Sequence, residues 1–206
     1  MKRVSLTLSV AAIAAALSGC RDVQGRAAAE DTSYRLRPGY VIDSVKPPEV
    51  ELSEFRAGLG PAPTRLSGGA ASFDRLMSAF ARAVEGNDSL ALQRMQLDAA
   101  EFAWLIYPSS PYTKPPYRES PRMVWLQLRG GDTGLRRLLE RRGGERLELV
   151  GWQCDPEPAV EGENRLWRRC SVRTIGPSGD TLRERLFGVV VERHGHFKFA
   201  SYQNQY

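Results

Sequence analysis

The sequence predicts an α+β domain in which N-terminal helices pack on a C-terminal four-stranded antiparallel meander. Apolar residues recur at helical spacing in the first half of the domain, as at Phe73, Leu76, Met77 and Phe80. From residue 147 onward the pattern changes to stretches rich in strand-forming residues, separated by turn sequences. Helices followed by closely connected strands are typical of the α+β class, with the helices covering one face of the sheet.

Each expected helix has a capping residue at its start or a breaker at its end. The expected N-caps are Ser72, Asp88, Asp98, Ser120 and Asp132, and the expected stops are Gly86, Pro108 and Gly143-Gly144. The run Asp98-Ala99-Ala100-Glu101 has the spacing of a capping box.

Four strands are expected, and the last two form a hairpin. Their ranges are Leu147 to Cys154, Leu166 to Ile175, Leu182 to Arg193 and Phe197 to Tyr202. At His194-Gly195 we expect a three-residue loop, which would set Glu192 opposite Lys198 and Val191 opposite Phe199. That register pairs charge with charge and apolar with apolar.

Composition and charge exclude several classes of protein. The chain has 206 residues, of which 42% are hydrophobic and 26% charged, so it is neither fibrous nor a coiled coil nor wholly disordered. Without Lys2 and Arg3, which lie in a leader, 27 basic residues face 24 acidic ones. This excess is too small to indicate a nucleic-acid partner.

The first twenty residues have the three parts of an export signal. Met1-Lys2-Arg3 is followed by an uncharged run of 14 residues, Val4 to Leu17, which is shorter than the roughly 20 that span a membrane. The run ends in Leu17-Ser18-Gly19-Cys20, which resembles the lipobox of bacterial lipoproteins. The resemblance implies that Cys20 carries a diacylglycerol and becomes the new N-terminus. An ordinary secretory signal with an incidental cysteine is the alternative.

The leader sets the expected location and domain organisation. Arg21 follows the cysteine instead of the aspartate that retains enterobacterial lipoproteins at the inner membrane, which favours the periplasmic face of an outer membrane. We expect a signal peptide at 1–19, a flexible tether at 20–33, a partly ordered extension and linker at 34–71, and the globular domain at 72–206.

Cys154 and Cys170 are expected to form a disulfide, because an exported domain matures in an oxidising compartment. If the hairpin turns about Gly162, the residue numbers of antiparallel partners sum to 324, which is the sum for these two cysteines. A redox-active pair is the alternative, although the spacing is not Cys-x-x-Cys.

The order of elements is similar to that of the NTF2-like cone fold, in which N-terminal helices are wrapped by a curved meander. That similarity implies a cavity between helices and sheet, and its candidate lining is Asp98, Glu101, Trp104 and Tyr107. Asp98 and Glu101 share a helical face and could serve there as an acid/base pair. Capping of their own helix explains the same spacing.

Two further features are candidate interaction sites. His194 and His196 are the only histidines, but no third ligand lies near them in sequence, so we expect turn chemistry and no metal. The segment Tyr107 to Tyr117 spaces three tyrosines among four prolines, and Tyr112 and Tyr117 are candidates for an interaction surface. Packing of these rings on the domain's own core is the alternative.

Together these patterns predict a non-catalytic binding module, anchored to the membrane by its N-terminal lipid. Its expected partner is an envelope protein, a glycan or a small ligand, with no cofactor and no catalytic residues. The chain has no Gly-x-Ser-x-Gly, no glycine-rich phosphate loop and no cysteine left over as a nucleophile. The alternative is a small-molecule carrier or enzyme with an NTF2-like cavity.

Overall fold

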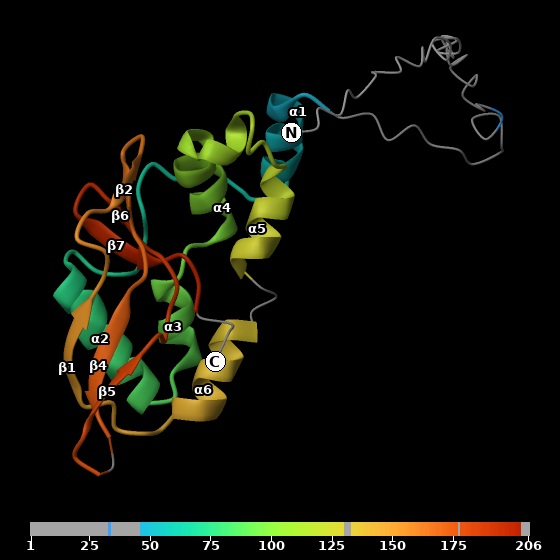
Figure 1. The fold of residues 1–206 in the computed structure, drawn as a ribbon. Helices are drawn as coiled ribbons and strands as arrows, with labels where there is room; N and C mark the ends of the chain where they lie inside the picture. Colours follow the sequence, from blue (N-terminus) through green and yellow to red (C-terminus); the bar gives the residue numbers. More distant parts are fainter. Residues whose placement is uncertain (1–32, 34–45, 130–132, 177, 203–206) are drawn as a thin grey trace, which may run out of the picture. The chain divides into compact units, whose positions relative to one another are not determined.

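The computed structural model describes residues 33, 46–129, 133–176 and 178–202, and it confirms the α+β class. Helices precede antiparallel strands along the chain (Figure 1). In the described part of the chain, no helix combines the length and apolar character that crossing a membrane requires. Residues 34–45, which begin the expected extension, lie outside the described residues.

The helices follow the predicted caps. The α-helices are α1 (Pro48–Arg56), α2 (Phe73–Glu85), α3 (Ser89–Met95), α4 (Ala99–Glu101), α5 (Pro121–Arg129) and α6 (Thr133–Arg142). A π-helical turn, η2 (Phe102–Ile106), and two 3-10 turns, η3 (Tyr107–Ser109) and η4 (Pro111–Thr113), follow α4. The Ser72 hydroxyl accepts from Arg75 N, and the Asp88 carboxylate accepts from Ala91 N, as expected of N-caps. The predicted cap Asp132 lies outside the described residues.

The strands form two antiparallel sheets, so the prediction of a single four-stranded meander is wrong. The strands are β1 (Leu149–Gln153), β2 (Ala159–Glu161), β3 (Asn164–Trp167), β4 (Ser171–Ile175), β5 (Thr181–Glu184), β6 (Val190–Arg193) and β7 (His196–Phe199). One sheet has the order β1-β4-β5 and the other has the order β2-β3-β6-β7. The described strands close no barrel.

The second sheet exists because two of the expected strands are each interrupted. The expected strand Leu166 to Ile175 breaks near Arg169, whose φ of 48° lies in the left-handed region and cannot continue a ladder. The expected strand Leu182 to Arg193 breaks after β5 ends at Glu184, and β6 begins only at Val190. The chain therefore passes from one sheet to the other at both places.

The predicted disulfide between Cys154 and Cys170 is present and confirms the expected pairing. In the β1–β4 ladder Gln153 lies opposite Ser171, so the cysteines occupy the next positions, and their Cα atoms are 3.9 Å apart. The bridge stands where the chain leaves the three-stranded sheet. It therefore fastens the junction between the two sheets.

The β6–β7 hairpin turns through two residues, so the predicted three-residue loop is wrong. His194 and Gly195 have φ of 51° and 74°, and positive φ at both central residues defines the tight type I′ hairpin turn. The ladder therefore pairs Val191 with Lys198 and Glu192 with Phe197. A shift of one residue turns every side chain of a strand to the opposite face. Lys198 consequently points into the protein instead of facing Glu192.

Two hydrophobic clusters hold these layers together. The first lies between α2, α3, α6 and the strands, and Phe73 stacks there on Trp152 of β1 at 3.9 Å between ring centroids. The second lies among α1, η2, α5 and the four-stranded sheet, and Phe55 of α1 meets Phe102 edge to face at 6.0 Å. Figure 1 shows α1, α4 and α5 gathered at one end of the domain.

Residues 46–71 pack against the rest of the domain in several places. Arg56 of α1 donates to the carbonyl of Ala103 at 2.8 Å. Leu66 is buried in the second cluster, and Ala70 pairs with Phe197 of β7 through two backbone hydrogen bonds. Residues 46–71 therefore belong to the same compact unit as the helices and strands that follow.

Candidate functional site

A buried ion pair between Glu101 and Lys198 lies at the centre of the candidate site. The carboxylate and the ammonium are 2.7 Å apart, and their side chains are only 1% and 3% exposed. Glu101 also accepts hydrogen bonds from Ser67 N at 2.6 Å, from the Ser67 hydroxyl at 3.1 Å and from Asp98 N at 3.1 Å. Four donors therefore satisfy this carboxylate, as a buried charge requires.

The predicted capping box is confirmed. Asp98 accepts from Glu101 N at 2.7 Å, while Glu101 reaches back to Asp98 N. The two side chains have different surroundings, because Asp98 is exposed whereas Glu101 is buried. The two residues on this shared face therefore cap the start of α4.

The other two predicted pocket residues have structural partners of their own. Tyr107 is 2% exposed and donates from its hydroxyl to the carbonyl of Glu119 at 2.7 Å. Burial raises the pKa of this phenol above its usual range. Trp104 is half-buried beneath the guanidinium of Arg56, 5.1 Å from the ring centroid. Neither these residues nor Asp98 and Glu101 line any of the three clefts described below.

A cleft of about 530 Å³ opens between the loop at residues 65–68 and the β6–β7 hairpin, and we name it the hairpin cleft. It is lined by Arg65, Leu66, Ser67, Gly68, Arg193, His194 and His196. The ion pair of Glu101 and Lys198 lies directly behind it, since Ser67 is in the lining and donates to Glu101. The position of the loop is thus fixed from inside the protein.

Arg193 is the fixed cation of the hairpin cleft. Its guanidinium donates to the side-chain oxygen of Asn164 at 3.0 Å and to the carbonyl of Leu105, and it also pairs with Glu163. The side chain is 13% exposed, and its Nε has no hydrogen-bond partner among the described residues. A buried donor without a partner is costly to the folded state, and the other contacts hold the guanidinium in place despite that cost.

The two histidines border the same cleft in different ways. His196 donates from Nε2 to the carbonyl of Gly68, which joins the hairpin to the loop. His194 is 62% exposed, and its Nε2 lies 3.5 Å from the carboxylate of Glu163. Among the described residues, no group of three or more histidine, cysteine, aspartate and glutamate side chains is placed to hold a metal ion.

A second cleft, of about 520 Å³, lies between α2 and α3 and meets the hairpin cleft at Gly68. We name it the helix cleft. Its lining includes Gly68, Gly69, Arg82, Asp88 and Arg94. The loop at residues 67–69 is therefore the ridge between the two clefts.

The ridge can be made only by glycine. Gly68 and Gly69 have φ of 67° and 64°, in the left-handed region. A Cβ on Gly68 would lie 2.4 Å from the carbonyl oxygen of Arg94, and one on Gly69 would lie 2.2 Å from that of Phe197. The loop is thus wedged between the end of α3 and β7.

A third cleft, of about 620 Å³, lies between α3 and α6, and its lining includes Leu135, Leu139, Arg136 and Glu140. The two charged residues of its described lining pair with each other at 2.9 Å, so they leave no unpaired charge there. It is therefore a weaker candidate for ligand binding than the two clefts at Gly68.

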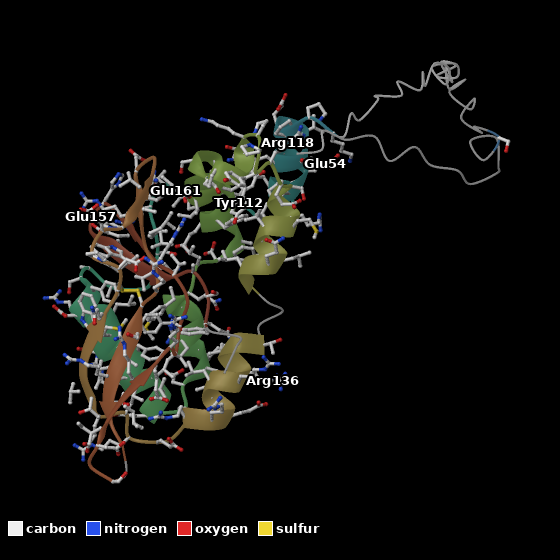
Figure 2. All side chains as sticks on the ribbon, in the orientation of Figure 1. Glu54, Tyr112, Arg118, Arg136, Glu157 and Glu161 are labelled. Carbon is white, nitrogen blue, oxygen red and sulfur yellow. A yellow bond between two sulfur atoms is a disulfide. The ribbon has the colours of Figure 1, made fainter. Side chains whose placement is uncertain are left out.

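The tyrosine-rich segment divides between core and surface. Tyr107 is buried, whereas Tyr112 and Tyr117 are 41% and 67% exposed. The segment is fastened to α1, because Arg118 donates to the carbonyl of Lys46 at 2.7 Å. Figure 2 shows Tyr112 and Arg118 at the same end of the domain as Glu54 of α1. Whether Tyr112 and Tyr117 bind a partner stays a prediction, as does the lipidation of Cys20, which lies outside the described residues.

Comparisons with known proteins add no assignment. No protein-family model, no curated protein and no solved structure matches this chain. The candidate site therefore depends on the geometry described above.

Sequence reasoning finds the two histidines but misses the rest of the cleft lining. The sequence pattern places Arg65, Ser67 and Gly68 in a linker, and it indicates only the end of a strand at Arg193. The adjacent glycines Gly68 and Gly69 are the available clue, because consecutive glycines often mark a close approach of two backbones.

We predict that Gly68→Ala destabilises the domain by about 3 kcal/mol, because the new Cβ must displace the backbone of Arg94 as well as strain φ. Gly60→Ala is the matched control, since Gly60 has φ of 75° but no atom lies within 4 Å of the position that a Cβ would take there. It should cost about 1 kcal/mol. Urea denaturation measures both, and equal losses would show that the ridge is not closely packed.

Proposed function

We propose that this chain is a lipid-anchored envelope protein whose α+β domain is a non-catalytic binding module, and that the hairpin cleft is its binding site. The lipobox-like sequence Leu17-Ser18-Gly19-Cys20 supports the anchor. The cleft supports binding, because a concave site with a few convergent polar groups is the usual form of a ligand site. The NTF2-like cone stays a prediction, and the proposal does not depend on it.

The observation that carries the non-catalytic assignment is the state of Ser67 and His196. A serine nucleophile needs a hydrogen bond to a neighbouring base. The Ser67 hydroxyl instead donates to the buried carboxylate of Glu101, and Nε2 of His196 donates to the carbonyl of Gly68. Ser67 and His196 are therefore both engaged in holding the loop and do not pair with each other.

The lining of the hairpin cleft supports recognition. It combines two arginines, one buried and held in place by other residues and one exposed, with two imidazoles whose ring nitrogens can donate or accept hydrogen bonds. The buried ion pair and the hydrogen bond from His196 hold the two walls of the cleft, which are the loop at residues 65–68 and the β6–β7 hairpin. Because the walls are already ordered, ligand binding would lose little conformational entropy.

We predict that Cys20→Ala moves the protein from the membrane fraction to the soluble fraction. Several acyl chains, at about 0.8 kcal/mol for each buried CH₂, anchor a protein almost permanently, whereas the described domain has no membrane-spanning helix to replace them. Fractionation with a salt wash measures the distribution. A Cys20→Ala protein that still sediments with membranes after the wash would contradict the anchor.

We predict that the imidazole resonances of His194 and His196 shift when fractions of an envelope extract are titrated into the Cys20→Ala protein. The chain has only two histidines, so each resonance can be assigned by a single substitution to Gln. The indole N–H of Trp104 is the internal control, and it should not move. Shifts confined to Trp104, which lines none of the three described clefts, would place the binding site outside the hairpin cleft.

A further inference from the structure

We propose that the ligand of this module is an acidic polysaccharide whose carboxylates or phosphates lie across the ridge at Gly68 and occupy both the hairpin cleft and the helix cleft. The inference rests on the proposed function, because it assumes that the hairpin cleft binds a ligand. It adds the chemical class of that ligand and extends the site into the helix cleft.

The charges lining the two clefts are unbalanced. Four arginines contribute to the linings against one aspartate: Arg65, Arg82, Arg94, Arg193 and Asp88. The aspartate is engaged as the N-cap of α3. Glu163 adds one carboxylate beside the hairpin cleft, and it pairs with Arg193 and lies near His194.

Three of these arginines are free to bind an anion. Within the described part of the chain, Arg65, Arg82 and Arg94 form no ion pair and no side-chain hydrogen bond, and all three are exposed. By contrast, Arg142 and Arg169 each pair with a carboxylate. An unpaired guanidinium presents five donors in a planar fork that fits a carboxylate or a phosphate.

The geometry favours an extended ligand. The two clefts are similar in volume, about 530 and 520 Å³, and they share Gly68 in their linings. Gly68 is exposed and has no side chain, so the ridge between them is low. A chain molecule can therefore cross from one cleft to the other and meet arginines on both sides, whereas a compact ligand would fill only one.

The linings of the two clefts fit single-stranded nucleic acids and lipid surfaces less well than an acidic polysaccharide. Proteins that bind single-stranded nucleic acid stack bases on aromatic rings, yet the described linings of the two clefts contain no Phe, Tyr or Trp. Insertion into a lipid surface needs exposed apolar residues, and none of the large exposed apolar side chains of the described chain lines either cleft. An acidic polysaccharide needs neither feature and is compatible with an envelope address.

The test measures binding of fluorescein-labelled polygalacturonate oligomers to the Cys20→Ala protein by anisotropy. Polygalacturonate supplies a regular row of carboxylates, neutral dextran is the uncharged control, and oligo(dT) represents nucleic acid. We expect saturable binding of polygalacturonate that weakens with added salt, weaker binding of oligo(dT), and no binding of dextran. Binding of dextran equal to that of polygalacturonate, or tighter binding of oligo(dT), would overturn the proposal.

Matched triple variants locate the site. Arg65→Gln/Arg82→Gln/Arg94→Gln should weaken polygalacturonate binding roughly tenfold, since each exposed ion pair contributes modestly. Arg75→Gln/Arg122→Gln/Arg185→Gln removes the same charge from exposed arginines outside the three described clefts, and it should change binding less than twofold. Equal losses in the two variants would show binding by net charge alone and overturn the site.

These experiments distinguish a wrong ligand class from a wrong binding site. If histidine resonances respond to envelope fractions but polygalacturonate does not bind, the hairpin cleft stands as the site and the ligand class is wrong. If polygalacturonate binds and only the control triple variant loses affinity, the polysaccharide class stands and its placement at the ridge is wrong.

Discussion

The buried ion pair of Glu101 and Lys198 is the interaction on which the rest of the candidate site depends. Its two charges are almost entirely removed from water, and each would be costly without the other. Glu101 also binds the loop through Ser67 and closes the capping box of α4 through Asp98. One carboxylate thus joins three parts of the chain that are far apart in sequence: the loop, the start of α4 and β7.

The pair in turn depends on how the last hairpin turns. Because His194 and Gly195 form a two-residue turn, Lys198 faces inward and can reach Glu101. The same register places His196 against the carbonyl of Gly68. The loop is then held at Ser67 from behind and at Gly68 from the hairpin, and this fixed loop forms the ridge between the two clefts.

Features encoded locally can be predicted from the sequence, whereas features set by tertiary geometry cannot. The caps at Ser72, Asp88 and Asp98 depend on a few neighbouring residues, and the structure confirms each of them. The register of the β6–β7 hairpin depends on whether its loop has two or three residues. Pairing the charges of Glu192 and Lys198 favours three residues, whereas the structure has two. The arginines of the two clefts are distributed over some 130 positions of sequence without a motif, so only the fold brings them together.

A double-mutant cycle on Glu101→Gln and Lys198→Met tests most directly whether this pair holds the structure. Each single variant leaves a buried group without its partner and should lower the free energy of unfolding by about 3 kcal/mol. The double variant should cost clearly less than the sum, with a coupling of about 2 kcal/mol, while the exposed pair Arg136 and Glu140 should show less than about 1 kcal/mol. Additive losses at Glu101 and Lys198 would contradict the account.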